Sequence, residues 1–201
     1  GSTHINLWYR LTTAFAEQEL MEHPAKSRHL PTVWYPSVGI YAARQGSWVL
    51  GAKFGSNGDS HNHNDVGSVT LYRDGRPLLI DVSKKTFSPQ RYEIWTMQSA
   101  WHNLPTFDGV QQLPGAEYTA REVRTDKNNI TGELADAYPP IPGLTTYHRC
   151  VSVSEQGIDL LDETDYPGTV ELTLLTEQQP VPTADGFAVG ALGGIRFDPE
   201  K

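Results

Sequence analysis

Residues 67–81 read GSVTLYRDGRPLLID, in which two apolar runs flank Asp74 and Gly75. An Asp-Gly pair in this setting is the strongest short-range signal for a β-hairpin with a type I′ turn. The turn fixes the register of the two strands, because it sets Arg73 opposite Arg76. The sequence therefore predicts an antiparallel hairpin with one apolar face and one polar face.

The predicted register assigns each side chain of the hairpin to one of these faces. The apolar face packs on the core and carries Val69, Leu71, Leu78 and Ile80. The opposite face is polar and available to a groove, a ligand or solvent, because successive strand residues point to opposite sides. It carries Ser68, Thr70, Tyr72 and Asp81.

Short runs of β-branched and aromatic residues, separated by glycine and proline, continue to the C-terminus. This pattern is typical of an antiparallel β-sandwich or barrel, so we predict a mainly β chain. The expected strands are Gly39–Arg44, Trp48–Phe54, Gly67–Tyr72, Pro77–Val82, Tyr118–Thr125, Asn129–Leu134, Thr146–Ser154, Ile158–Glu163, Val170–Leu175 and Ala188–Phe197. Before them, apolar residues at helical spacing between Leu7 and Phe15 predict one amphipathic helix over Ile5–Glu22, which His23 and Pro24 end.

Composition excludes several classes of protein. The chain has 201 residues, enough for one domain of ordinary size, and a formal net charge of -8, which disfavours nucleic acid and anionic membranes as main partners. Its single cysteine, Cys150, excludes an intramolecular disulfide. No stretch approaches the roughly 20 apolar residues of a membrane span.

Histidines and carboxylates gather on both sides of the hairpin. His61 and His63 precede it, Asp81 ends it and His102 follows. Imidazoles and carboxylates are common zinc ligands and common acid and base groups of enzymes. We expect a zinc site formed by His63, Asp81 and His102, although two solvated histidines, a strand-end cap and a buried structural histidine would give the same spacing.

The predicted register limits how such a site can form. Asp81 would pair with Ser68, and an extended strand would place His63 roughly 16 Å from that pair. A single ion cannot bridge this distance. The chain must therefore turn back near Gly67, where glycine permits a left-handed backbone, so that residues 58–64 form a loop over the polar face.

Aromatic residues crowd the segment between the hairpin and His102. They are Phe87, Tyr92, Trp95 and Trp101, and polar residues stand among them. Aromatic rings with polar neighbours stack on sugar rings and donate hydrogen bonds to them, but they also pack in protein cores. Both roles remain open from the sequence.

Four stretches together resemble the heparinase II/III-like family of polysaccharide lyases. They lie between Pro36 and Val123, in the family's order and at compatible spacing, and they read HNHNDVGS (61–68), LID (79–81), RYEIWTMQS (91–99) and HNLP (102–105). The resemblance implies an antiparallel β-sandwich that follows an α/α-toroid domain, with the substrate cleft between the two. This chain would then consist of a helix and linker over residues 1–28, left from a missing toroid, and the sandwich over residues 29–201. Gly1 and Ser2 resemble the remnant of a removed purification tag.

Members of this family cleave glycosaminoglycans or alginate by β-elimination. Carried over residue by residue, the resemblance implies that His61 is the active-site histidine and that His63, Asp81 and His102 bind a structural zinc ion. Tyr92 lies where some members have a tyrosine that contacts substrate. The implied partners are an acidic polysaccharide and the protein's own toroid domain. Because the toroid carries the family's other catalytic groups, we expect this chain alone to be inactive.

Two other interpretations stay open. A cupin-type metalloenzyme would explain Gly55 followed by His61 and His63, but Gly67 and Ser68 stand where that motif requires a glutamate. A non-catalytic carbohydrate-binding sandwich would use the aromatic residues to bind sugar and a metal ion only for stability.

Overall fold

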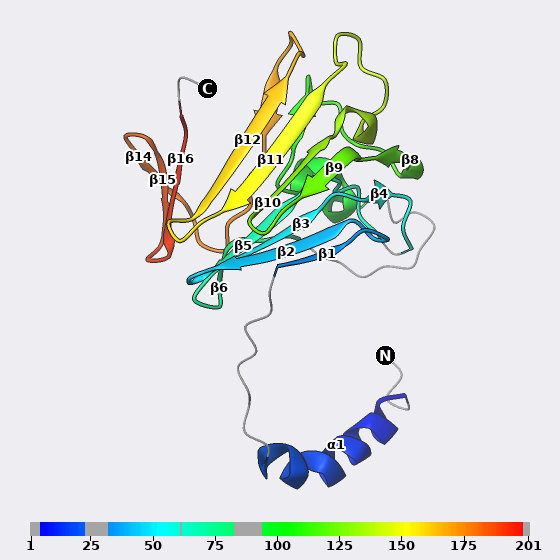
Figure 1. Cartoon of the computed structure of the whole chain (residues 1–201), viewed down its shortest axis with the longest axis vertical. Helices are drawn as coiled ribbons and strands as arrows, with labels where there is room; N and C mark the ends of the chain where they lie inside the picture. Colours follow the sequence, from blue (N-terminus) through cyan, green and yellow to red (C-terminus); the bar gives the residue numbers. More distant parts are fainter. Residues whose placement is uncertain (1–4, 23–31, 61, 83–93, 199–201) are drawn as a thin grey trace. The chain divides into compact units, whose positions relative to one another are not determined.

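The structure is a computed structural model that describes residues 5–22, 32–60, 62–82 and 94–198 (Figure 1). The chain forms two compact units, Gly1–Leu30 and Pro31–Lys201. The first unit contains helix α1, Ile5–Glu22, with the bounds that the sequence predicts. Several of its large apolar side chains, including Trp8 and Phe15, are exposed. Within the described part of the chain, no helix combines the length and the apolar character needed to cross a membrane.

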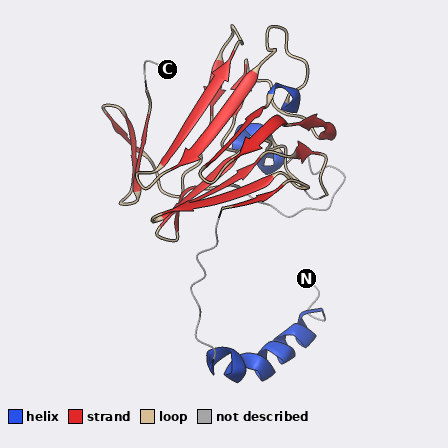
Figure 2. Cartoon of the chain, viewed as in Figure 1, coloured by secondary structure: helices blue, strands red, loops and turns tan. Residues whose placement is uncertain are grey.

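The second unit consists of antiparallel strands (Figure 2). The larger sheet joins, in spatial order, β1 (Val33–Tyr35), β2 (Ile40–Gln45), β3 (Trp48–Lys53), β5 (Val69–Arg73) and β6 (Arg76–Leu79). The opposing sheet joins β12 (Ile158–Thr164), β11 (Tyr147–Val153), β10 (Asn129–Glu133) and β9 (Arg121–Thr125). The predicted mainly β fold is confirmed.

Smaller elements complete this unit. Strand β4 (Ser56–Asn57) pairs with β8 (Gly115–Thr119), and β7 (Pro105–Phe107) pairs with β13 (Val170–Leu172). The C-terminal sheet joins β14 (Val181–Thr183), β15 (Gly186–Val189) and β16 (Gly193–Arg196). The described residues also form the short 3₁₀ helices η2 (Trp95–Met97), η3 (Ser99–Trp101) and η4 (Ala135–Ala137).

The core lies between the two larger sheets, which face one another in Figure 1. Alternate residues of each strand point inward, so Leu50 and Val69 of one sheet and Ile130 and Val151 of the other are almost completely buried. Burial of apolar surface at roughly 25 cal/mol per Å² is the main force that holds two such layers together.

The β5–β6 hairpin has the predicted turn but not the predicted register throughout. Asp74 and Gly75 are left-handed, with φ of 51° and 74°. Arg73 pairs with Arg76 as predicted, but Leu71 pairs with Leu79 rather than with Leu78. The ladder shifts by one residue beyond the Tyr72–Pro77 pair, so that β6 carries one extra residue there. With this shift, the consecutive residues Leu78 and Leu79 are both buried.

Two predicted strands are each divided in the structure. The expected strand Tyr118–Thr125 is split between β8 and β9 at Ala120, whose N–H donates to the carbonyl oxygen of Gly55 at 2.9 Å. The expected strand Ala188–Phe197 is the β15–β16 hairpin, which turns at Gly190 with φ of 53°. The prediction also lacked β1, β4, β7, β14 and the start of β15.

One buried cation joins the two larger sheets. Arg149 lies on the inner face of β11 and is fully buried. Its Nε and Nη2 atoms donate to the carboxylate of Asp162 at 2.7 and 2.6 Å. Its Nη1 atom donates to the carbonyl oxygens of Gly67 and Asn103, at 2.9 and 2.8 Å. The guanidinium therefore connects one sheet to the two segments that border the other.

Replacing Arg149 with methionine should destabilise the protein by about 3–5 kcal/mol, because Asp162 and two backbone carbonyls lose their partner inside the core. Denaturation with urea measures the change. The matched control is Arg121→Met, since the ion pair of Arg121 with Asp136 is exposed (58% and 57% of the side chains) and should cost at most about 1 kcal/mol. Similar losses for both variants would contradict the proposed structural role of Arg149.

The chain turns back before β5 at Gly67, as the sequence predicts. Gly67 has φ of 93°, and the N–H of Ser68 donates to the carbonyl oxygen of Asp65 at 3.0 Å. A Cβ atom on Gly67 would lie 2.5 Å from Cδ1 of Leu134, inside van der Waals contact. Glycine is thus required both by the backbone conformation and by close packing.

Alanine at Gly67 should destabilise the fold more than alanine at Gly75. Both positions have positive φ, which costs an alanine roughly 1–2 kcal/mol, but nothing lies within 4 Å of a Cβ atom on Gly75. The overlap with Leu134 should add about 1–3 kcal/mol at Gly67. Urea denaturation of both variants isolates this difference, and equal losses would show that the overlap is relieved without cost.

Candidate functional site

Acidic and imidazole side chains meet where the hairpin ends. Among the residues that the structure describes, one group could hold a metal ion: atoms of Asp65, Asp81 and His102 that can act as ligands lie within 4.8 Å of one another. His102 Nδ1 is 2.5 Å from Oδ1 of Asp81. The ring of His63 lies beside this group, with its centroid 5.2 Å from that of His102. We call these four residues the imidazole–carboxylate cluster.

The cluster brings together residues from three separate segments. Asp81 lies two residues beyond the end of β6, and His102 directly follows η3. His63 and Asp65 belong to the segment between β4 and β5, which the turn at Gly67 folds back toward them. Their meeting therefore depends on the turn and not on a continuous strand ladder.

Asn103 fixes the backbone next to His102. Its Nδ2 atom donates to the carbonyl oxygens of Val69 and Ile80, at 2.7 and 2.8 Å, where the two hairpin strands separate. Its Oδ1 atom accepts from the N–H of Leu175 at 2.6 Å. Because Asn103 is completely buried and held by these bonds, the preceding residue, His102, has a fixed position beside Asp81.

A second buried amide holds the segment that carries His63 and Asp65. The side chain of Gln112 accepts from the N–H of Val66 at 3.1 Å and donates to the Val66 carbonyl oxygen at 2.7 Å. It also accepts from Asn57 at 3.0 Å, and Asn57 in turn accepts from the N–H of Asp65 at 3.1 Å. These bonds replace the strand ladder that the segment lacks.

Charge in the cluster is only partly balanced. The ammonium group of Lys53 forms an ion pair with Asp65 and also donates to the carbonyl oxygen of His63 at 3.5 Å. Burial, and next the neighbouring His102, lower the pKa of His63 below its usual range, against the opposing effect of Asp65 and Asp81. His63 is therefore neutral at pH 7, and its ring nitrogen lone pair is available to a metal ion.

The donor set fits a borderline divalent metal such as zinc. Two carboxylates and two imidazoles are zinc ligands, and one lysine leaves part of the carboxylate charge uncompensated. The Nε2 atom of His102 is buried without a hydrogen-bond partner among the described residues. Buried polar atoms are normally satisfied, so this nitrogen is suited to a partner from outside the described residues, such as a metal ion.

The predicted site residues differ in where the structure places them. Asp81 and His102 are in contact, and His63 packs against His102. His61 and Tyr92 lie outside the described residues. The metal role of His63, Asp81 and His102 stays a prediction.

Sequence reasoning missed Asp65, Lys53, Asn103 and Gln112 as parts of the site. Asp65 and Asn103 stood within the quoted motif stretches and were given no role. Lys53 and Gln112 carried no recognisable signal, because their contacts depend on how distant segments pack.

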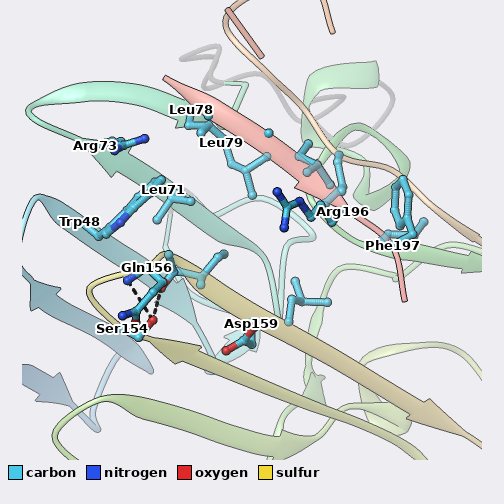
Figure 3. A pocket seen from close by; sticks show the side chains of 18 residues that line it. Trp48, Leu71, Arg73, Leu78, Leu79, Ser154, Gln156, Asp159, Arg196 and Phe197 are labelled. Carbon is cyan, nitrogen blue, oxygen red and sulfur yellow. Dashed lines mark hydrogen bonds between the residues drawn. The ribbon is translucent and has the colours of Figure 1, made fainter. Parts of the chain in front are cut away.

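A large cavity lies elsewhere in the second unit. Its volume is about 710 Å³, and strands β5, β6, β12 and β16 contribute to its walls (Figure 3). Leucine and isoleucine side chains form much of the lining, together with Trp48, Arg73 and Arg196. Among the described residues that line it, Asp159 is the only carboxylate and there is no histidine. The cavity therefore lacks the acid and base groups that the cluster provides.

The chain is similar to several solved lyase structures. It matches a heparinase III, the BT4657 gene product, with a TM-score of 0.60 and 15% identity over 90% of this chain and 30% of that one. It matches the heparan sulfate lyase HepC from Pedobacter heparinus with a TM-score of 0.56 and 19% identity over 87% and 29%. A further heparinase III gives a TM-score of 0.55 and 16% identity over 81% and 28%.

The TM-scores show a shared fold, and this chain spans about 30% of the first matched structure's length. No significant match was found among the curated proteins. A sequence model of the family described as heparinase II/III-like, C-terminal, matches residues 27–179, which is more than half of the chain. The chain therefore belongs to the heparinase II/III-like C-terminal domain family, as its motifs predict.

Proposed function

We propose that this chain is the β-sandwich part of a longer polysaccharide lyase that cleaves uronic-acid-containing polysaccharides, of glycosaminoglycan or alginate type, by β-elimination. The convergence of His63, Asp65, Asp81 and His102 carries the proposal. It joins distant segments into one rigid group two residues from His61. Family membership and the lyase names of the matched structures support the reaction class.

The reaction explains why a histidine is needed. A base removes the C5 proton of the uronate, the C–H electron pair becomes the C4–C5 double bond, and the bond from C4 to the glycosidic oxygen breaks. That oxygen leaves with a proton as a hydroxyl group. The C5 proton is weakly acidic unless the neighbouring carboxylate charge is neutralised, and a histidine that titrates near neutral pH can neutralise it or accept the proton.

In this proposal His61 acts on the substrate and Tyr92 contacts it. The remaining catalytic groups come from an α/α-toroid domain of the longer protein, so the chain alone has little or no activity. The cleft would form between the two domains, as ligand sites often do at domain interfaces.

We assign His63, Asp81 and His102 as ligands of a structural zinc ion, with Asp65 as a further carboxylate beside it. The ion would add a divalent charge that links the segment before the hairpin to Asp81 and His102. Asp81 Oδ1 lies 2.5 Å from Nδ1 of His102, so these two groups would present adjacent ligand atoms to the ion. The segment that carries His61 would thereby be held in one position.

The family match favours this function over a cupin-type metalloenzyme. A non-catalytic carbohydrate-binding sandwich would share the fold and the metal site. It differs from the lyase in one observable respect, since binding without elimination would persist in the longer protein.

Replacing His63, Asp81 or His102 by alanine should abolish stoichiometric zinc binding to this chain, because each change removes a ligand. Metal analysis after equilibration with zinc measures the content. The wild type should gain about 2.7 kcal/mol of stability at a free zinc concentration roughly 100 times Kd, and the variants should gain almost none. The matched control is Asp136→Ala, an exposed carboxylate paired with Arg121. Full zinc content in any of the three variants would remove that residue from the site.

Substitution of His61 by alanine in the longer protein should lower the elimination rate by about 10²–10⁴-fold, the usual contribution of one acid or base group. Ultraviolet absorbance of the unsaturated uronide follows the reaction on heparan sulfate, hyaluronan and alginate. His148→Ala is the control, because His148 lies on β11 and bonds to Thr131 rather than to the cluster. Unchanged activity in the His61 variant would refute its catalytic assignment. Zinc content is measured alongside, so that a loss of activity is not attributed to His61 when the ion has been lost.

A further inference from the structure

Two tryptophans stand exposed beside each other on the short helices before His102. Trp95 in η2 is 51% exposed and Trp101 in η3 is 45% exposed. Their rings contact edge to face, with centroids 4.7 Å apart and an angle of 65° between the planes. In contrast, Trp48 of the core is only 6% exposed. We call Trp95 and Trp101 the tryptophan pair.

The backbone beneath the pair is firmly anchored. Thr96, Met97 and Ser99, which lie between the two tryptophans in the sequence, are buried. The N–H of Gln112 donates to Oγ of Ser99 at 3.0 Å. The N–H of Ala100 donates to Oε1 of Gln111 at 2.9 Å. The segment is therefore packed against the domain while its two largest apolar side chains remain in solvent.

Such an arrangement leaves apolar surface of the domain unburied. Burial of an aromatic side chain would stabilise the fold by roughly 1.5–3 kcal/mol, yet two adjacent indoles forgo much of it. Contiguous exposed apolar surface on a protein marks a binding site more often than chance. The edge-to-face contact also fixes the two rings relative to each other, which lowers the entropy lost when a ligand binds.

The pair lies next to the imidazole–carboxylate cluster. Trp101 directly precedes His102, so their Cα atoms are about 3.8 Å apart. The carbonyl oxygen of Met97, two residues after Trp95, accepts from the N–H of Asn64 at 3.0 Å, and Asn64 directly follows His63. A polysaccharide bound beside the cluster would therefore lie close to the segment that carries the tryptophan pair.

Because this chain is negatively charged overall, an uncharged indole contact is a suitable way for it to bind an acidic sugar. The formal net charge is -8, which repels a polyuronate. Two basic residues nearby are already engaged, since Lys53 pairs with Asp65 and Arg149 with Asp162. An indole ring offers an apolar face to the C–H groups of a pyranose and an N–H donor to its oxygen atoms, with no need for a free cation.

We propose that Trp95 and Trp101 form a sugar-binding subsite that stacks on a pyranose ring of the polysaccharide next to the cluster. This proposal rests on the proposed function for the identity of the ligand. It assigns the pair a role in substrate positioning and not in the chemical step. Because the contact is uncharged, its contribution to affinity depends little on salt, unlike that of a basic groove.

The test is calorimetric titration of this zinc-equilibrated chain with hexasaccharides of heparan sulfate, hyaluronan and alginate, at low and high salt. The wild type should bind at least one of the three. Trp95→Ala and Trp101→Ala should each weaken binding by about 3- to 10-fold. Trp95→Phe and Trp101→Phe should retain most of the wild-type affinity, because an aromatic ring remains. The matched control is Tyr35→Ala, another aromatic residue that is 55% exposed, on β1.

Several outcomes would overturn the subsite. They are no binding by the wild type to any of the three hexasaccharides, unchanged affinity in both alanine variants, or an equal loss in Tyr35→Ala. A dimer of the wild type that either alanine variant converts to a monomer would assign the pair to self-association instead. Failure of the lyase function is seen separately, because the wild-type longer protein would then form no unsaturated uronide from any of the three polymers. That result would not alter the interpretation of the binding data.

Discussion

The charge of Arg149 is the constraint on which much of this domain depends. A guanidinium group stays protonated in proteins, so when it is fully buried its donors must be satisfied from within. Asp162 neutralises it from the neighbouring strand, and Gly67 and Asn103 accept its remaining bonds. The strand pair β11–β12 is thereby tied to the two segments that build the candidate site.

The candidate site likewise depends on hydrogen bonds that satisfy buried polar groups. Neither the segment before β5 nor the segment around His102 belongs to a strand ladder, so both need other partners for their backbone groups. Gln112 and Asn103 supply them through buried side-chain amides. Rigid amides, rather than sheet pairing, thus hold the imidazoles and carboxylates at one place.

Local features of the fold could be predicted because local sequence determines them. The helix from Ile5 to Glu22 follows from apolar periodicity, and the hairpin turn follows from Asp74 and Gly75. The need for a turn at Gly67 followed from simple distances along a strand. In contrast, the shifted ladder after Pro77 and the division of a strand at Ala120 depend on competing partners elsewhere in the fold. Pairing of Lys53 with Asp65 is likewise a property of packing and left no trace in the pattern of residues.

The bonds of Asn103 couple the site to the folding of the whole domain. One side chain joins both strands of the hairpin and the segment at Leu175, and the next residue back is His102. Opening this region to insert or remove the proposed ion would break three buried hydrogen bonds at once, which makes local release costly. Exchange of the proposed zinc ion should accordingly be slow, and its loading is expected to accompany folding of the new chain rather than follow it.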